Sequence, residues 1–384
     1  MRTRRLRLLV AASVGAVTLC SCSGLASGGG DETYAIAYQG PLSGDTAQLG
    51  INIGRAVQLA IEQANEHGDL PFDLEYVTAD DKGLPEQSPG AARQLIRDRR
   101  VVAVIGPAFS GPALEAGDLY ENAGLATVSP SATSPSISDA GFATFFRAVP
   151  QDTEQGDQAA SYLAGVVKAQ RVYIVDDTTD YGSGLADALA EELTGLAVPV
   201  QRNGVPTTTD DYTKVAEEVV RSGADALYYA GYYADAAPLA GALQEVGFHG
   251  IRMGGDGLND DKFIARAGGA AEGWQFTCGC TDARSDPASA QFFDDYAARF
   301  EVNPGTYSPE AYDATQAVIA VLRNIPGQIT RRAVIEGLRS VNYGGIVKTI
   351  KFQPDGETQG ATIFLYEVRN GKRQLRGSIL ELSG

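Results

Sequence analysis

The stretch VVAVIGPAFSGPALEAG, residues 101–117, joins an apolar run to a segment with helical character. The run at 101–105 predicts a buried strand, and the Gly-Pro pair at 106–107 ends it. Ser110 stands where its side chain can cap the helix that follows. The free N–H groups of the first turn and the positive end of the helix dipole favour a carboxylate at this place.

The same alternation of strand and helix continues along the chain. Expected strands cover residues 33–40, 72–81, 101–106, 125–129, 171–177, 198–205, 224–231 and 251–256. Expected helices cover residues 50–68, 88–100, 111–124, 153–169, 182–193, 212–223 and 235–247. This order predicts an α/β protein of two similar lobes, each a doubly wound parallel sheet with helices on both faces. Ligands of such sheets bind at the carboxyl ends of the strands.

Length and charge limit the number of domains and the kinds of partner that this chain can have. A chain of 384 residues exceeds the usual size of one domain, which agrees with two lobes. It carries 48 acidic and 31 basic side chains, a formal net charge of −17. Nucleic acid is therefore excluded as a partner, because phosphate binding needs clustered lysine and arginine.

The N-terminus predicts export. Arginines precede an apolar run at 8–19 that is too short for a transmembrane helix. The run ends in Leu19-Cys20-Ser21-Cys22, which is similar to a bacterial lipobox with Cys22 as the lipidated residue. We expect a lipoprotein signal peptide at 1–21 and a flexible tether at 22–32. A plain secretory peptide with an incidental cysteine is the alternative.

Two cysteines remain after such processing, Cys278 and Cys280. A C-x-C spacing closes only a small ring, and two ligands alone do not make a zinc site. A local disulfide and a pair of buried thiols are both open, and no function is assigned to them.

Four expected strand-end loops are rich in glycine, serine, threonine and tyrosine and lack lysine, arginine and histidine. They are residues 108–112, 129–136, 176–184 and 230–236. Tyr181 and Tyr232 lie where a ring can face a crevice between the lobes, whereas Tyr233 is expected to pack. Asp256, between glycines at the end of a strand, suits an ammonium group opposite neutral donors.

In sequence order, several motifs make the chain resemble the substrate-binding proteins of branched-chain amino acid ABC transporters, the leucine/isoleucine/valine-binding type. The resemblance covers nearly all of residues 33–384. The motifs are GPLSGDTAQLG, GPAFSGPALEAGDLYE, SPSATSPSIS, FRAVPQDTEQG, DDTTDYGSGLADAL, YYAGYYADA, MGGDGL and YSPEAYDA.

The resemblance implies a site for an amino acid zwitterion. Ser110 and the Thr133 amide would bind the ligand carboxylate. The Ser131 carbonyl, the Thr133 hydroxyl and Asp256 would bind its ammonium group. The residues implied for the side-chain pocket are Tyr181, Tyr232, Tyr307, Ala108, Phe109 and Leu49. Because a zwitterion brings both charges, dipoles and one acid suffice without lysine or arginine.

Several positions depart from the family pattern. Asp256 is one methylene shorter than the usual glutamate, and Leu49 stands where tyrosine is common. Phe109 replaces a smaller residue and can shrink or reshape the pocket. A disulfide of the family is missing, because Gly83 and Phe109 occupy its two positions.

The implied fold is the type I periplasmic-binding architecture, with a three-segment hinge. Lobe 1 is expected at 31–149 and 279–356, and lobe 2 at 150–278 and 357–384. Closure of the cleft would deliver the ligand to an ABC permease served by a separate ATPase. We expect a monomer, anchored to the cell membrane by lipid on its extracytoplasmic side, with no cofactor and no metal.

Other functions have less support in the sequence. An enzyme is disfavoured because the chain has only His67 and His249 and lacks a nucleophile elbow, a P-loop, a G-x-G-x-x-G motif and metal-ligand spacing. A lipid-anchored ligand sensor is an alternative that would need a separate signalling partner. A small amide or urea is the alternative ligand, suggested by Leu49 and Phe109.

Overall fold

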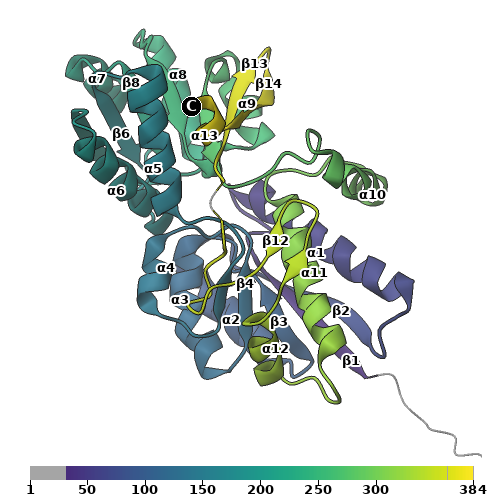
Figure 1. The fold of residues 1–384 in the computed structure, drawn as a ribbon. Coiled ribbons are helices and arrows are strands. Elements are labelled where there is room, and N and C mark those ends of the chain that lie inside the picture. Colours follow the sequence, from purple (N-terminus) through teal and green to yellow (C-terminus); the bar gives the residue numbers. More distant parts are fainter. Residues whose placement is uncertain (1–31, 361, 384) are drawn as a thin grey trace, which may run out of the picture.

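The computed structural model of the chain describes residues 32–360 and 362–383 (Figure 1). The predicted signal peptide at 1–21 and Cys22 lie outside the described residues, as does the predicted tether except for Glu32. Within the described part of the chain, no helix has the length and apolar character needed to cross a membrane.

The first sheet has five strands, and all its pairings are parallel. Its strand order is β2-β1-β3-β4-β5. The strands are β1 (Thr33–Gly40), β2 (Asp73–Asp80), β3 (Val101–Ile105), β4 (Ala126–Ser129) and β5 (Phe145–Arg147). The order reverses between β1 and β3, and open α/β sheets bind ligands at such a switch point.

Helices cover both faces of this sheet, as the strand pattern predicts. Ile36 and Tyr38 of β1 share one core with α1 and α11, whereas Ala35 and Ala37 point to the opposite face, toward α2 and α3. The helices and short strands on this side of the molecule are α1 (Ala47–His67), α2 (Ser88–Arg97), α3 (Ser110–Asn122), α4 (Pro135–Ala140), α10 (Ala290–Phe300), α11 (Ser308–Asn324), α12 (Arg331–Leu338), β11 (Tyr343–Gly344) and β12 (Thr349–Ile350). We call this body lobe 1.

The second sheet has seven strands in the order β14-β13-β10-β9-β8-β6-β7. They are β6 (Val172–Asp176), β7 (Val200–Gly204), β8 (Ala226–Ala230), β9 (Ile251–Gly254), β10 (Gln275–Cys278), β13 (Phe364–Arg369) and β14 (Lys372–Ser378). Strands β6 to β10 pair in parallel, and their order in the sheet matches that of β1 to β5 in lobe 1. The two lobes are therefore similar, as predicted. The sheet with its helices is lobe 2.

Lobe 2 ends in an antiparallel hairpin that the strand pattern did not predict. β13 pairs antiparallel with both β10 and β14. The turn residues Asn370 and Gly371 have φ angles of 53° and 67°. Positive φ at both central residues is the requirement of the tight turn that joins antiparallel strands, and Asn-Gly meets it at low cost.

The helices of lobe 2 are α5 (Asp152–Tyr162), α6 (Asp180–Gly195), α7 (Thr213–Ser222), α8 (Tyr233–Glu245), α9 (Asp261–Ala267) and α13 (Ile379–Ser383). Four of these six, α5 to α8, agree with the expected ones within a few residues at their starts, whereas α9 and α13 were not predicted. A π-helical turn at Leu163–Val167 continues α5, so the helix expected at 153–169 changes its pitch after Tyr162. Thr179 caps α6 by accepting a hydrogen bond from the Gly182 amide at 3.0 Å.

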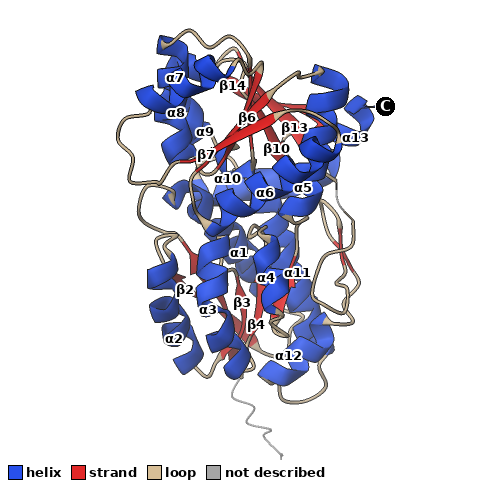
Figure 2. Cartoon of the chain, turned by 90° about the vertical axis from the view of Figure 1, so that its left-hand side faces the viewer, coloured by secondary structure: helices blue, strands red, loops and turns tan. Residues whose placement is uncertain are grey.

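The lobes stand one above the other, and the chain passes between them three times (Figures 1 and 2). The passages follow β5, follow β10 and precede β13. Cys278, the last residue of β10, forms a disulfide with Cys280, with Cα atoms 5.0 Å apart. The sequence left open whether these cysteines form a disulfide or remain buried thiols, and the structure has the disulfide. It lies at the start of the second passage.

Candidate functional site

Ser110 is the first residue of α3 and is buried. Phe109 holds the N-cap position, and no side chain caps the helix. The expectation that Ser110 caps α3 is therefore wrong, because the helix starts one residue earlier than a serine cap would need. Its hydroxyl instead accepts a hydrogen bond from the Ser134 amide at 3.2 Å, which holds the next loop and leaves the hydroxyl proton free for another acceptor.

The loop after β4 brings Ser131 and Thr133 beside the start of α3. The Ser131 hydroxyl donates to the Ala108 carbonyl at 2.7 Å, and the Asp152 amide donates to the Thr133 carbonyl at 2.9 Å. The Ser134 hydroxyl is buried without a hydrogen-bond partner, and because a buried unpaired hydroxyl is costly, it is available for a ligand. The Thr133 hydroxyl makes no hydrogen bond of ordinary geometry, but it lies near enough to the Asp152 carboxylate to oppose the rise of that acid's pKa.

Asp256 follows β9 and lies at the centre of a hydrogen-bond cluster. Its Oδ1 accepts hydrogen bonds from the side-chain amide of Gln155 at 2.9 Å and from the Tyr181 hydroxyl at 2.7 Å. Its Oδ2 accepts from the Tyr307 hydroxyl at 2.6 Å. The predicted side chains of Tyr181 and Tyr307 thus reach the predicted acid with their polar ends. Three donors fix the orientation of the Asp256 carboxylate without neutralising it.

A second buried acid, Asp152, was missed as a site residue. It is the first residue of α5, where the helix dipole favours a negative charge. Neither of its carboxylate oxygens has a hydrogen bond of ordinary geometry. Gln155, one turn later on the same helix, binds Asp256. Both residues belong to the motif FRAVPQDTEQG, whose D-x-x-Q spacing could have identified them.

Both site acids have raised pKa values. Burial raises the pKa of Asp152 well above its usual value and the nearby charge of Asp256 raises it further, although the Thr133 side chain and the charge of Arg147 oppose this shift. Burial also raises the pKa of Asp256, although hydrogen bonds from Tyr307, Tyr181 and Gln155 oppose this shift. A bound ammonium group would stabilise both charged carboxylates.

A small cavity of about 10 Å³ lies between the lobes at this point. Its lining combines most of the predicted residues with two that were missed, Ile53 and Gly257. It is formed by Leu49, Ile53, Phe109, Ser131, Tyr181, Tyr232, Asp256, Gly257 and Tyr307. Ala108, Ser110 and Thr133 are buried beside it but do not line it. No lysine or arginine is among the lining residues, as the sequence predicts for a zwitterion site.

The lobes contact one another around the cavity. Asn52 of α1 donates to Asp260 at 3.1 Å, and Tyr307 of lobe 1 reaches Asp256 of lobe 2. Tyr233 packs in the core as predicted, and its hydroxyl also accepts from the Gln48 amide at 3.4 Å. The structure is therefore that of a closed cleft.

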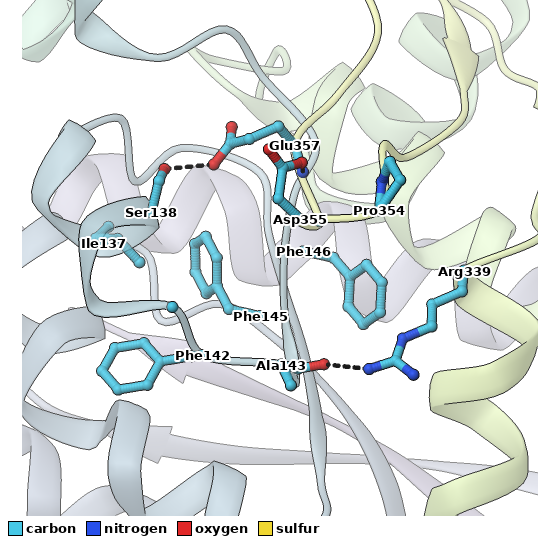
Figure 3. Close-up of a pocket in the computed structure, with 12 residues that line it drawn as sticks. Ile137, Ser138, Phe142, Ala143, Phe145, Phe146, Arg339, Pro354, Asp355 and Glu357 are labelled. Carbon is cyan, nitrogen blue, oxygen red and sulfur yellow. Dashed lines mark hydrogen bonds between the residues drawn. The ribbon is translucent and has the colours of Figure 1, made fainter.

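A larger hollow of about 220 Å³ lies in lobe 1 (Figure 3). Phenylalanines form much of its wall, and Ser138 donates to Glu357 at 2.6 Å at its rim. None of the predicted site residues lines it. Among the described residues, no group of three or more histidine, cysteine, aspartate and glutamate side chains could hold a metal ion.

Two lobes of equal strand order that close on a cavity built from strand-end loops define a hinged binding protein. The sequence profile of the periplasmic binding protein family matches residues 33–373, and the chain belongs to that family.

Known relatives agree with this class. An amino acid binding protein of Pseudomonas aeruginosa is 28% identical over 337 residues, covering 86% of this chain and 89% of the relative. A leucine-, isoleucine-, valine-, threonine- and alanine-binding protein of the same organism is 28% identical over 339 residues, covering 88% and 90%. The crystal structure of a leucine binding protein of Thermotoga maritima superposes with a TM-score of 0.83 at 24% identity, covering 90% of this chain and 98% of that one.

Proposed function

We propose that this protein is the substrate-binding component of an ABC importer and captures an amino acid zwitterion between its lobes. The observation that carries the proposal is the gathering of two buried carboxylates, Asp152 and Asp256, at a cleft that no lysine or arginine lines. Such a site repels a lone anion and needs a ligand that supplies positive charge.

The ligand carboxylate binds the hydroxyl of Ser110 and the amide of Thr133, at the positive end of the α3 dipole. The ammonium group binds the Ser131 carbonyl, the Thr133 hydroxyl and Asp256, with Asp152 as a further acceptor. The ligand's side chain lies among Leu49, Ile53, Ala108, Phe109, Tyr181, Tyr232 and Tyr307. The names of the relatives, which include branched-chain and smaller amino acids, support this ligand class.

The lobes are proposed to divide at 31–149 with 279–356 and at 150–278 with 357–384, so that the three passages form the hinge. Closure presents a joined surface to a permease, and the ligand leaves unchanged, because the protein breaks no bond. We further propose a monomer outside the cytoplasm, held at the cell membrane by lipid on Cys22.

The test is a binding screen on protein that has been unfolded, dialysed and refolded to remove ligand. A ligand of the folded form raises the melting temperature, and calorimetry then gives its affinity. We expect amino acids to bind, and alaninamide and N-acetylalanine, which each lack one charge, to bind at least tenfold more weakly than alanine. Equal binding of alaninamide, or binding of urea and small amides in place of amino acids, would contradict the zwitterion site.

A further inference from the structure

We propose that the disulfide between Cys278 and Cys280 is a redox-sensitive lock of the hinge, which favours the closed cleft as long as it is intact. Its reduction by a dithiol frees the second passage between the lobes and weakens ligand binding. The inference rests on the proposed hinge and the proposed binding function, and it concerns residues that do not line the cleft.

The disulfide lies where the three passages meet. It closes a ring around Gly279, whose near neighbours come from the other two passages. A Cβ atom on Gly279 would lie 2.8 Å from Cδ of Pro150, in the first passage, and 3.7 Å from Cδ1 of Ile363, in the third. The first distance is shorter than real Cβ contacts allow, so the backbone of the second passage packs directly on the first. A change in the backbone angles of Gly279 therefore moves the passages relative to one another.

The disulfide restricts those backbone angles. Glycine has the greatest backbone freedom of any residue, and a bond between the side chains on either side of it removes much of that freedom. Hydrogen bonds hold the end of the same segment. Tyr366 donates to the Cys280 carbonyl at 2.8 Å, and the Thr281 amide donates to Glu310 at 2.7 Å. Among these restraints, the disulfide is the one that a reductant removes.

A chain of contacts runs from the disulfide to the interface between the lobes. The side-chain amide of Asn259 donates to Sγ of Cys280 at 3.3 Å. Asn259 directly follows the short helical turn that begins at Asp256, and its carbonyl accepts a hydrogen bond from the hydroxyl of Thr306 in lobe 1. The next residue, Tyr307, binds the Asp256 carboxylate. A ring that fixes the Cys280 sulfur therefore supports the contacts that join the closed lobes.

Reduction of this bond is a thiol–disulfide exchange. A thiolate of the dithiol attacks one cysteine sulfur, the S–S bond breaks, and the other cysteine leaves as a thiolate that takes up a proton. The second thiol of the reductant then displaces the attacked cysteine from the mixed disulfide, so both cysteines end as thiols. The two electrons come from the dithiol, which becomes a disulfide.

The closed cleft protects the bond from this reaction. Cys278 and Cys280 are 0% and 1% exposed, so a reductant reaches their sulfurs only when the surrounding passages move. A ligand that holds the lobes closed should therefore slow the reduction.

The first experiment measures binding of leucine, threonine and alanine to the full chain by calorimetry. One sample is refolded with the disulfide intact, and the other is reduced while unfolded and refolded in dithiothreitol. We expect the amino acid that binds best to lose about fivefold or more in affinity on reduction, the lower end of the usual range for coupled sites.

The double variant Cys278→Ser with Cys280→Ser is the matched control, because it keeps Cys20 and Cys22. It should bind like the reduced wild-type protein and should not respond to dithiothreitol. The second experiment follows the reduction of the native wild-type protein by alkylation and mass spectrometry. A saturating concentration of the best amino acid should slow the labelling of Cys278 and Cys280 by about fivefold or more.

The outcomes separate this proposal from the proposed function. Equal affinity of the oxidised and reduced forms, or an equal rate of reduction with and without the amino acid, overturns the lock and leaves the binding site standing. Protein that binds no amino acid in either redox state overturns the proposed function. The lock is then tested by hydrogen exchange without ligand, where reduction should speed exchange of the backbone amides at 279–281, and unchanged exchange overturns it.

Discussion

Arg147 and Glu357 form a buried ion pair that ties the end of β5 to the third passage between the lobes. Nε of Arg147 lies 2.9 Å from Oε2 of Glu357. The same guanidinium donates from Nη1 to the carbonyls of Ala132 at 2.8 Å and Ser134 at 3.0 Å, on either side of Thr133. The hinge and the loop proposed to bind the ligand are therefore held by one side chain.

Replacement of Arg147 by alanine should strongly destabilise the protein. It leaves the Glu357 carboxylate buried without its cation, and breaking a buried pair in this way costs about 3–5 kcal/mol. Urea unfolding measures the loss. Arg332→Ala is the control, because Arg332 pairs with Glu336 on the exposed surface of α12, where such pairs contribute about 0.3–0.5 kcal/mol. An equal effect of the two substitutions would contradict the assigned role.

Removal of either site acid should weaken amino acid binding while the fold persists. For Asp256→Ala we expect a loss of about 2–5 kcal/mol in binding free energy, since a buried ammonium loses its partner. Asp152→Asn should also weaken binding, because it removes a buried negative charge beside Asp256 that would stabilise the ammonium group. Calorimetry measures both effects, and Asp294→Ala on an exposed face of α10 is the control. Unchanged affinity in Asp256→Ala would reject that residue as an ammonium ligand.

Asp177 predicts a pH dependence of stability. Burial raises its pKa from 3.8 to about 7, although hydrogen bonds from Thr179 oppose the shift. A raised carboxyl pKa means that the folded state holds its proton more tightly than the unfolded state. The contribution of Asp177 to stability is therefore greatest below about pH 4 and is lost as the pH rises through 7.

Asp177→Asn removes this titration and should make stability depend less on pH. Relative to wild type, the variant should gain up to about 4 kcal/mol on going from pH 4 to pH 8, the equivalent of a three-unit shift. Urea unfolding at both pH values measures the change. A difference between variant and wild type that is the same at both values would show that Asp177 does not titrate in this range.

Gly83 and Gly68 allow a matched test of the contact with Phe109. Both have positive φ, 73° and 65°, so alanine is strained at either position. A Cβ at Gly68 meets nothing within 4 Å, whereas one at Gly83 meets the Phe109 ring. Gly83→Ala should therefore destabilise by about 1–3 kcal/mol more than Gly68→Ala in urea unfolding. In a Phe109→Ala background most of this excess should disappear.

Cys22→Ser tests the lipid anchor. Loss of the lipid-accepting sulfur should release the protein from the membrane fraction, since the described residues contain no helix able to span a bilayer. Cell fractionation with an antibody to the protein measures the distribution. Cys20→Ser is the matched control and should remain in the membrane fraction, and retention of Cys22→Ser there would contradict lipidation at Cys22.

Much of the fold could be predicted because each element carries its own pattern. The run Val101–Ile105 is buried throughout and forms β3, and the helix expected at 50–68 is α1. The hairpin β13–β14 was missed, although the Asn370-Gly371 pair is a local hairpin signal. The first residues of helices were predicted less accurately. Helix α3 begins at Ser110 and not one residue later, and a single hydrogen bond separates the two starting points.

The candidate site was predicted less completely. Asp256 could be identified because glycines surround it at a strand end, whereas Asp152 lies in a sequence that reads as an ordinary first turn of a helix. Only in the fold does its carboxylate meet the charge of Asp256, 104 positions later in the chain. Local sequence carries no information about that separation.

The sequence by itself determined the alternation of strands and helices, the two similar lobes and the absence of cationic side chains from the strand-end loops, because hydrophobic periodicity and residue type act over a few neighbouring positions. The tertiary structure decided which loops meet, that two acids and not one lie at the cleft, and that Phe109 stacks on Tyr232 with Gly83 behind it. Those relationships depend on how two lobes close on one another, and contacts across a cleft are set by packing in three dimensions.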